Sequence, residues 1–74
     1  MERKELTEAQ GRLYAAMIAH QRATGRPASM RELADAVGVS SLNGVVELLR
    51  RLERAGVVVH QPGARGWVAI EVQP

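Results

Sequence analysis

Residues 29 to 56, SMRELADAVGVSSLNGVVELLRRLERAG, predict two capped helices joined by a tight turn. Ser29 is followed three residues later by Glu32, a capping box in which each side chain accepts a hydrogen bond from the other residue's backbone N–H. Gly38 suits the left-handed conformation that ends a helix, so the second helix is expected to begin near Ser41. Each helix carries an apolar stripe, which is typical of a helix-turn-helix with a shared core. The stripes are Leu33, Ala34 and Val37, and Val45, Leu49 and Leu52.

The sequence on either side of this motif completes one small domain over residues 1–74. Thr7 and Gln10 form another capping box before a helix with an apolar stripe. Two β-rich stretches follow the motif and are separated by Pro and Gly, which predicts a hairpin. The expected elements are helices at about 7–23, 30–37 and 41–55 and wing strands at about 57–61 and 67–73. This order predicts a mainly α, α+β fold: a winged helix-turn-helix, with three helices and a two-stranded antiparallel wing.

The second strand alternates two sets of side chains, so each set lies on one face. Val68, Ile70 and Val72 make one face apolar throughout, and this face is predicted to cover the helices. Trp67 stands at the base of the wing, where an aromatic side chain is expected to pack on the edge of the core rather than stack on a base.

Composition excludes several kinds of site. The 74 residues contain no cysteine, so disulfides and thiolate metal sites are excluded, and His20 and His60 lie far apart without a third ligand. We therefore expect no metal and no cofactor. No carboxylate pair or Ser/His/Asp set is arranged for catalysis, so the chain is not expected to be an enzyme. No apolar run, the three valines at 57–59 included, is long enough to span a bilayer, which favours a cytoplasmic protein.

Six segments occur in a fixed order along almost the whole chain. They are LTEAQ at 6–10, TGRP at 24–27, RELA at 31–34, GVSSLNG at 38–44, LERAGV at 52–57 and GARG at 63–66. In this order and spacing they resemble the N-terminal DNA-binding domain of the LexA repressor family. That family also carries a C-terminal peptidase domain with a Ser-Lys dyad. The chain ends at Pro74 directly after the wing and has Lys4 as its one lysine, so self-cleavage is not expected.

The resemblance implies that the start of the third helix enters the major groove of DNA. The matching positions for base contacts are Ser41, Asn43, Gly44, Val46 and Glu47. An asparagine side chain pairs well with an adenine edge, and a glutamate accepts from cytosine. The family usually has a proline where Leu42 stands and an acidic residue where Val46 stands. The recognition surface is therefore unusually apolar, and the family's operator preference does not transfer.

Five arginines are candidates for contacts with DNA phosphates: Arg31, Arg50, Arg51, Arg54 and Arg65. Three of them cluster on the later turns of the third helix, where cations also favour the helix C-terminus, so a solvated face is the alternative interpretation. The formal net charge of the chain is +2, which is compatible with phosphate binding without requiring it.

Two functional hypotheses follow. The first is a small transcriptional regulator that binds double-stranded DNA sequence-specifically, with a homodimer on adjacent half-sites expected because one module makes a small footprint. The second is a protein-interaction module on the same scaffold, which docks on the transcription machinery through Leu42 and Val46. Four residues apart on a helix, these two side chains face the same way and can serve a protein partner or thymine methyl groups.

Overall fold

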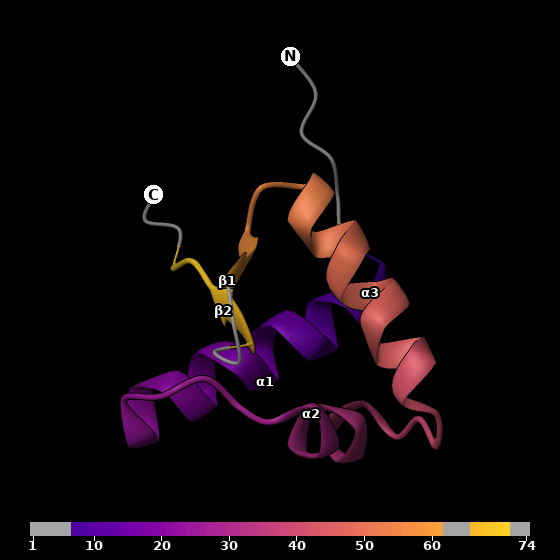
Figure 1. Ribbon diagram of the computed structural model, residues 1–74, viewed down its shortest axis with the longest axis horizontal. Helices are drawn as coiled ribbons and strands as arrows, with labels where there is room; N and C mark the ends of the chain where they lie inside the picture. The colour runs from indigo at the N-terminus through magenta and orange to yellow at the C-terminus, as the bar shows by residue number, and fades with distance from the viewer. Residues whose placement is uncertain (1–6, 62–65, 72–74) are drawn as a thin grey trace.

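The computed structural model describes residues 7–61 and 66–71, which form three helices followed by a β-hairpin (Figure 1). The helices are α1 (Glu8–Thr24), α2 (Met30–Val37) and α3 (Leu42–Arg54), and the antiparallel strands are β1 (Val58–Gln61) and β2 (Gly66–Ala69). The predicted α+β winged helix-turn-helix fold is confirmed. The second strand, predicted to reach residue 73, ends at Ala69, and residues 72 and 73 lie outside the described ranges.

Side-chain caps fix where the helices begin. The Ser29 hydroxyl accepts a hydrogen bond from the N–H of Glu32 at 3.1 Å, and the Glu32 carboxylate accepts from the N–H of Ser29 at 2.8 Å. Thr7 and Gln10 form the same reciprocal pair before α1, with both distances 3.2 Å. These bonds satisfy N–H groups that have no partner inside the helix. At the end of α2, Gly38 has a φ of 75°, which glycine adopts without steric cost, so the chain turns directly toward α3.

The three helices share one apolar core. Its largest side chains are at most 1% exposed, and they come from every helix and from β1. They are Leu13, Met17, Leu33, Val45, Leu49, Leu52 and Val58. The predicted stripe of α3 is thereby confirmed in full, and this burial decides which side of α3 faces outward. No helix in residues 7–61 is long and apolar enough to cross a membrane.

The hairpin turns the opposite face of β2 toward the core from the one that the sequence predicted. Ala69 is 4% exposed, whereas Ile70 is 40% exposed, and Val68 is only partly buried. The predicted core-facing side of β2 was wrong, and the register between the two strands gives the reason. Ala69 pairs with the buried Val58, and directly paired residues share a face of the sheet. Val72, the third residue of the predicted face, lies outside the described residues.

Trp67 belongs to the same core-facing side of β2. It packs against the buried cluster, which confirms the packing role predicted for it. Its cross-strand partner is His60, and the two rings stack with centroids 4.2 Å apart and an interplanar angle of 17°. The stacked pair continues the inner face of the hairpin beyond the aliphatic core.

Helix α1 holds the hairpin in place through side-chain bonds to the backbone. The Gln21 amide nitrogen donates to the Ala69 carbonyl at 3.0 Å, and the Ala69 N–H donates to the Gln21 side-chain oxygen at 2.7 Å. Tyr14 donates through its hydroxyl to the carbonyl of Ile70 at 2.5 Å. All three bonds join residues 48 or 56 positions apart in sequence, so they fix the hairpin relative to the helices.

We expect the Gln21→Met variant to be less stable because it keeps the side-chain length and loses both bonds to Ala69. A part-buried backbone group left without a partner costs roughly 1–3 kcal/mol, so the free energy of unfolding in urea should fall by at least about 1 kcal/mol. The control is Gln61→Met at an exposed position of β1, which should change it by less than about 0.5 kcal/mol. Equal losses in the two variants would contradict this role of Gln21.

Glu32 also links α2 to α1 electrostatically. Its pKa lies below the usual value of 4.5, chiefly because of the backbone hydrogen bond from Ser29, then because of the Ser29 side chain, and to a smaller extent because of His20. The Nε2 atom of His20 lies 3.7 Å from a carboxylate oxygen of Glu32. The fold therefore favours the ionised form of this carboxyl group.

The lowered pKa of Glu32 predicts a pH-dependent contribution to stability. The contribution is present above pH 4.5 and is lost as the pH falls through the lowered pKa of the folded state. Glu32→Gln keeps an acceptor for the capping bond but has no charge to lose. Thermal unfolding should show the natural protein to be more stable than this variant at neutral pH, with a difference that shrinks in acid. A difference that stays constant across this range would disprove the prediction.

Candidate nucleic-acid interface

One face of α3 is polar along its whole length, because the opposite face is buried in the core. Residues three and four apart are neighbours on a helix, which places Asn43, Glu47, Arg50 and Arg54 on the same side. All four side chains are exposed, and we call them the polar stripe of α3. An amide and a carboxylate lie toward the start of the helix, and two guanidinium groups lie toward its end. The stripe thus combines hydrogen-bonding groups at one end with positive charge at the other.

The start of α3 is shaped by the turn before it. Ser41 is the N-cap, and its hydroxyl accepts from the N–H of Asn43 at 3.2 Å. The Ser41 hydroxyl can still donate a hydrogen bond to another group, because the cap uses its oxygen only as an acceptor. Gly44 is partly buried, and a Cβ atom at this position would lie 4.0 Å from the Cβ of Val39, an ordinary contact distance. Glycine therefore leaves a flat helix surface here without being required by a clash.

An apolar flank, formed by Leu42 and Val46, lies beside the polar stripe. Leu42 is 50% exposed, and Val46, one turn later, is partly buried. The positions predicted for base contacts therefore differ in accessibility: Ser41, Asn43 and Glu47 are exposed, while Gly44 and Val46 are partly covered. All five lie at or within the first two turns of α3, and their contacts with bases remain a prediction.

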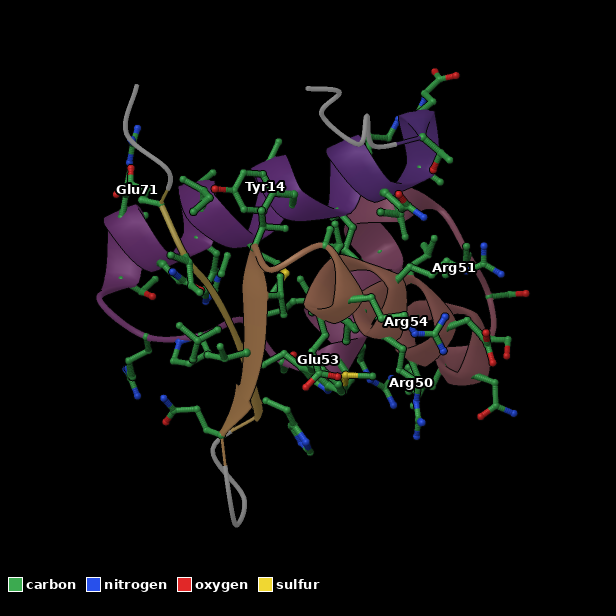
Figure 2. All side chains as sticks on the ribbon, turned by 90° about the horizontal axis from the view of Figure 1, so that it is seen from above. Tyr14, Arg50, Arg51, Glu53, Arg54 and Glu71 are labelled. Carbon is green, nitrogen blue, oxygen red and sulfur yellow. The ribbon has the colours of Figure 1, made fainter. Side chains whose placement is uncertain are left out.

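The arginine cluster of α3 lies at the far end of the helix. Figure 2 shows Arg50, Arg51 and Arg54 spread over the outer side of α3, away from the hairpin. All three are exposed, and within residues 7–61 and 66–71 none of them forms an ion pair. Arg31 is exposed in the first turn of α2, and Arg65 lies outside the described residues. The cluster therefore presents three guanidinium groups that form no ion pair with a described carboxylate.

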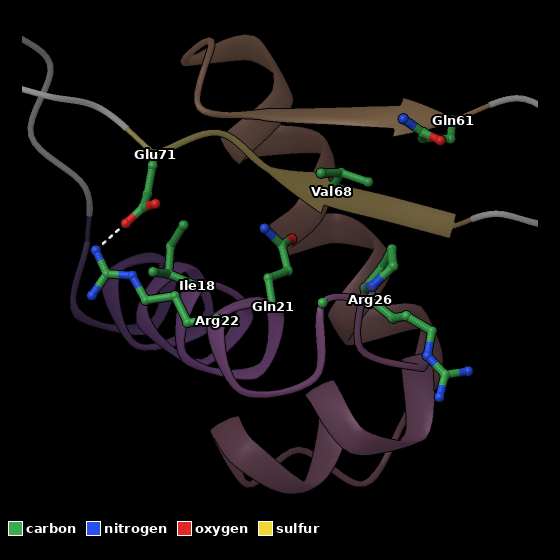
Figure 3. Close-up of a pocket in the computed structure, with 9 residues that line it drawn as sticks. Ile18, Gln21, Arg22, Arg26, Gln61, Val68 and Glu71 are labelled. Carbon is green, nitrogen blue, oxygen red and sulfur yellow. Dashed lines mark hydrogen bonds and ion pairs between the residues drawn. The ribbon is translucent and has the colours of Figure 1, made fainter.

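A groove of about 450 Å³ lies elsewhere, between the C-terminal end of α1 and the outer face of the hairpin (Figure 3). Its walls include Ile18, Pro27 and Val68, and the ion pair between Arg22 and Glu71 crosses one end. None of the described residues predicted to contact DNA lines this groove. The candidate interface is therefore the convex surface of α3 and not a pocket.

The described residues bring together no metal site. Within the two ranges that the structure covers, no three His, Cys, Asp or Glu side chains are grouped to hold an ion. His20 lies beside Glu32, and His60 stacks on Trp67, so each histidine has a structural neighbour. What the polar stripe of α3 offers instead is hydrogen bonding and charge at the surface of a helix.

Sequence reasoning missed the residues that position the hairpin. Neither the bond from Tyr14 to the Ile70 carbonyl nor the role of Gln21 was predicted. The available signal is that Tyr14 and Gln21 lie two turns apart and thus on one side of α1. Their partners are backbone groups near the other end of the chain, which no local pattern identifies.

A helix-turn-helix with an outward polar face on its second helix, followed by an antiparallel hairpin, defines the class of winged helix-turn-helix proteins. Comparison with known families identifies one family within this class. The model of the LexA DNA binding domain matches residues 3–66, and the chain belongs to this family.

Several curated LexA repressors are similar to the chain. The LexA repressor of Mycobacterium leprae (strain Br4923) is 42% identical over 57 residues, which cover 77% of this chain and 24% of that protein. The LexA repressor of Leifsonia xyli subsp. xyli is 40% identical over 60 residues, which cover 81% of this chain and 27% of that protein. The chain spans about a quarter of the length of the curated relatives it matches.

Proposed function

We propose that the protein is a small transcriptional regulator, most simply a repressor, that binds double-stranded DNA sequence-specifically with α3 in the major groove. The observation that carries this proposal is the polar stripe of α3 in a domain of the LexA DNA-binding family. The similar proteins are named as repressors, which favours repression. The major groove of B-DNA is wide enough to admit an α-helix, and it presents a distinct pattern of groups for each base pair.

The first two turns of α3 supply the proposed base contacts. The Asn43 side chain both donates and accepts, so it suits the N6 and N7 atoms of adenine, and the Glu47 carboxylate accepts from the N4 amino group of cytosine. Ser41 donates through its hydroxyl to a base or a phosphate. Gly44 lets the helix approach the base edges closely, and Val46 presents methyl groups to them. A correctly placed bidentate contact is worth roughly 1–3 kcal/mol of discrimination against a wrong base.

The arginines supply the proposed contacts with the DNA backbone. Arg50, Arg51 and Arg54 lie on the same helix as the base-reading residues, so their guanidinium groups can reach phosphates beside the groove. We propose the same role for Arg31 in α2 and for Arg65, which lies between β1 and β2 in the sequence. Such contacts position a protein on DNA and release counterions, which makes affinity fall as salt rises.

A single domain of this size makes a small footprint on DNA. Single modules bury roughly 600–1,000 Å² of protein surface, at the low end for specific complexes. We therefore propose that two copies bind adjacent half-sites as a homodimer. The proposed activity is binding alone, and it uses no cofactor.

The test of the proposal is selection from random-sequence duplex DNA at two salt concentrations. An enriched motif at the higher salt, especially a palindrome, is the expected result, because base contacts survive where purely phosphate-based binding weakens. Weak binding without any enriched motif, lost at the higher salt, would overturn sequence-specific recognition. A protein partner bound through the apolar flank of α3 would then be the stronger hypothesis, since Leu42 is half exposed.

Asn43→Ala should relax the preference at one base pair of the selected motif. The loss of a bidentate contact is expected to reduce discrimination there by about 1–3 kcal/mol and to leave the other positions unchanged. The measurement is a second selection with the variant, together with affinities for single-base mutants of the motif. An unaltered motif would show that Asn43 does not read a base.

Arg50→Ala should weaken binding to every DNA sequence by a similar factor. Removing one phosphate contact is expected to reduce the slope of log affinity against log salt by about 1, without changing the preferred motif. The matched control is Arg12→Ala, which also removes an exposed arginine but from α1, where it pairs with Glu8 at 3.2 Å. Equal salt dependence for the natural protein and the Arg50 variant would remove Arg50 from the phosphate contacts.

A further inference from the structure

Leu42 is the most exposed large apolar side chain in the described part of the chain. It is 50% exposed, compared with 41% for Val59 and 40% for Ile70, which belong to the hairpin region. Leu42 is the first residue of α3 and lies between the N-cap Ser41 and Asn43 of the polar stripe. An apolar group thus lies among the residues best placed to read bases.

The major groove has one common apolar feature that such a side chain can recognise. Base edges there present hydrogen-bond donors and acceptors, and thymine alone of the four bases adds a C5-methyl group. Leucine makes no hydrogen bonds, so its available contribution to base discrimination is burial of apolar surface. Val46 lies one turn after Leu42 on the same flank. Because Val46 is partly buried, it holds this apolar surface in a fixed position.

The size of the apolar flank favours a methyl group over a protein partner. A standard protein interface buries about 800 Å² on each side, far more than one half-exposed leucine and its partly buried neighbour provide. The other exposed large hydrophobic residues, Val59 and Ile70, are not on α3 and do not extend the flank along the helix. A single methyl group is small enough to be covered by these two side chains.

We propose that Leu42, supported by Val46, recognises the C5-methyl group of a thymine next to the base pair read by Asn43. This inference rests on the proposed function, because it assigns a further specificity-determining residue to the same DNA interface. It makes the protein sensitive to a methyl group that carries no hydrogen-bonding information.

The test replaces each thymine of the selected motif, one at a time, with deoxyuridine. This substitution removes the methyl group and keeps every hydrogen-bonding atom. Burial of one methyl group is worth about fourfold in affinity, so we expect about a fourfold loss at one or two thymines and none at the others. Leu42→Ala should bind the thymine and deoxyuridine duplexes equally at those positions.

The control is Ile70→Ala, which shortens a similarly exposed aliphatic side chain away from α3 and should keep the fourfold preference for thymine. Thermal unfolding of both variants verifies that they are folded. If the natural protein binds the motif but ignores every methyl group, the inference is overturned while sequence-specific binding stands, and the flank is left for a protein partner. If no motif is selected, the proposed function fails and the inference fails with it.

Discussion

The burial of one side of α3 is the constraint on which the rest of the molecule depends. Val45, Leu49 and Leu52 are each 0% exposed. Complete burial of an aliphatic side chain is worth about 1.5–3 kcal/mol, so three together approach the whole net stability of a typical domain, about 5–15 kcal/mol. Rotating α3 by one residue would turn its side chains by about 100° and lose much of this burial. The polar stripe is therefore directed outward by the hydrophobic core.

Helix α1 provides the frame that joins the two parts of the domain. Its buried face, with Leu13 and Met17, packs in the core that also holds the buried side of α3. Its polar side chains Tyr14 and Gln21 reach the backbone at the end of β2. Apolar packing thus orients α3, and hydrogen bonds orient the hairpin, with one helix supporting both. The geometry between α3 and the wing is set by a helix that is not itself expected to touch DNA.

The helices could be predicted from the sequence because their signals are local. Ser29 with Glu32 marks a helix start, Gly38 marks an end, and a period of three to four residues separates the buried side of α3 from its exposed side. The inward face of β2 could not be predicted, since the strand has apolar residues on both sides and Ala69 is smaller than its neighbours. The long-range bonds of Gln21 had no local signal, and base contacts depend on a partner that the sequence does not contain.

The bonds between Gln21 and Ala69 have a consequence for association between copies of the chain. The N–H and C=O groups along the edge of a sheet are free to pair with a strand of another molecule, which is a common start of aggregation. The hairpin has only two strands, so each of them is an edge. At Ala69 the side-chain amide of Gln21 takes both backbone groups, as the backbone of a third strand would. One glutamine therefore closes this part of the edge of β2 to sheet extension.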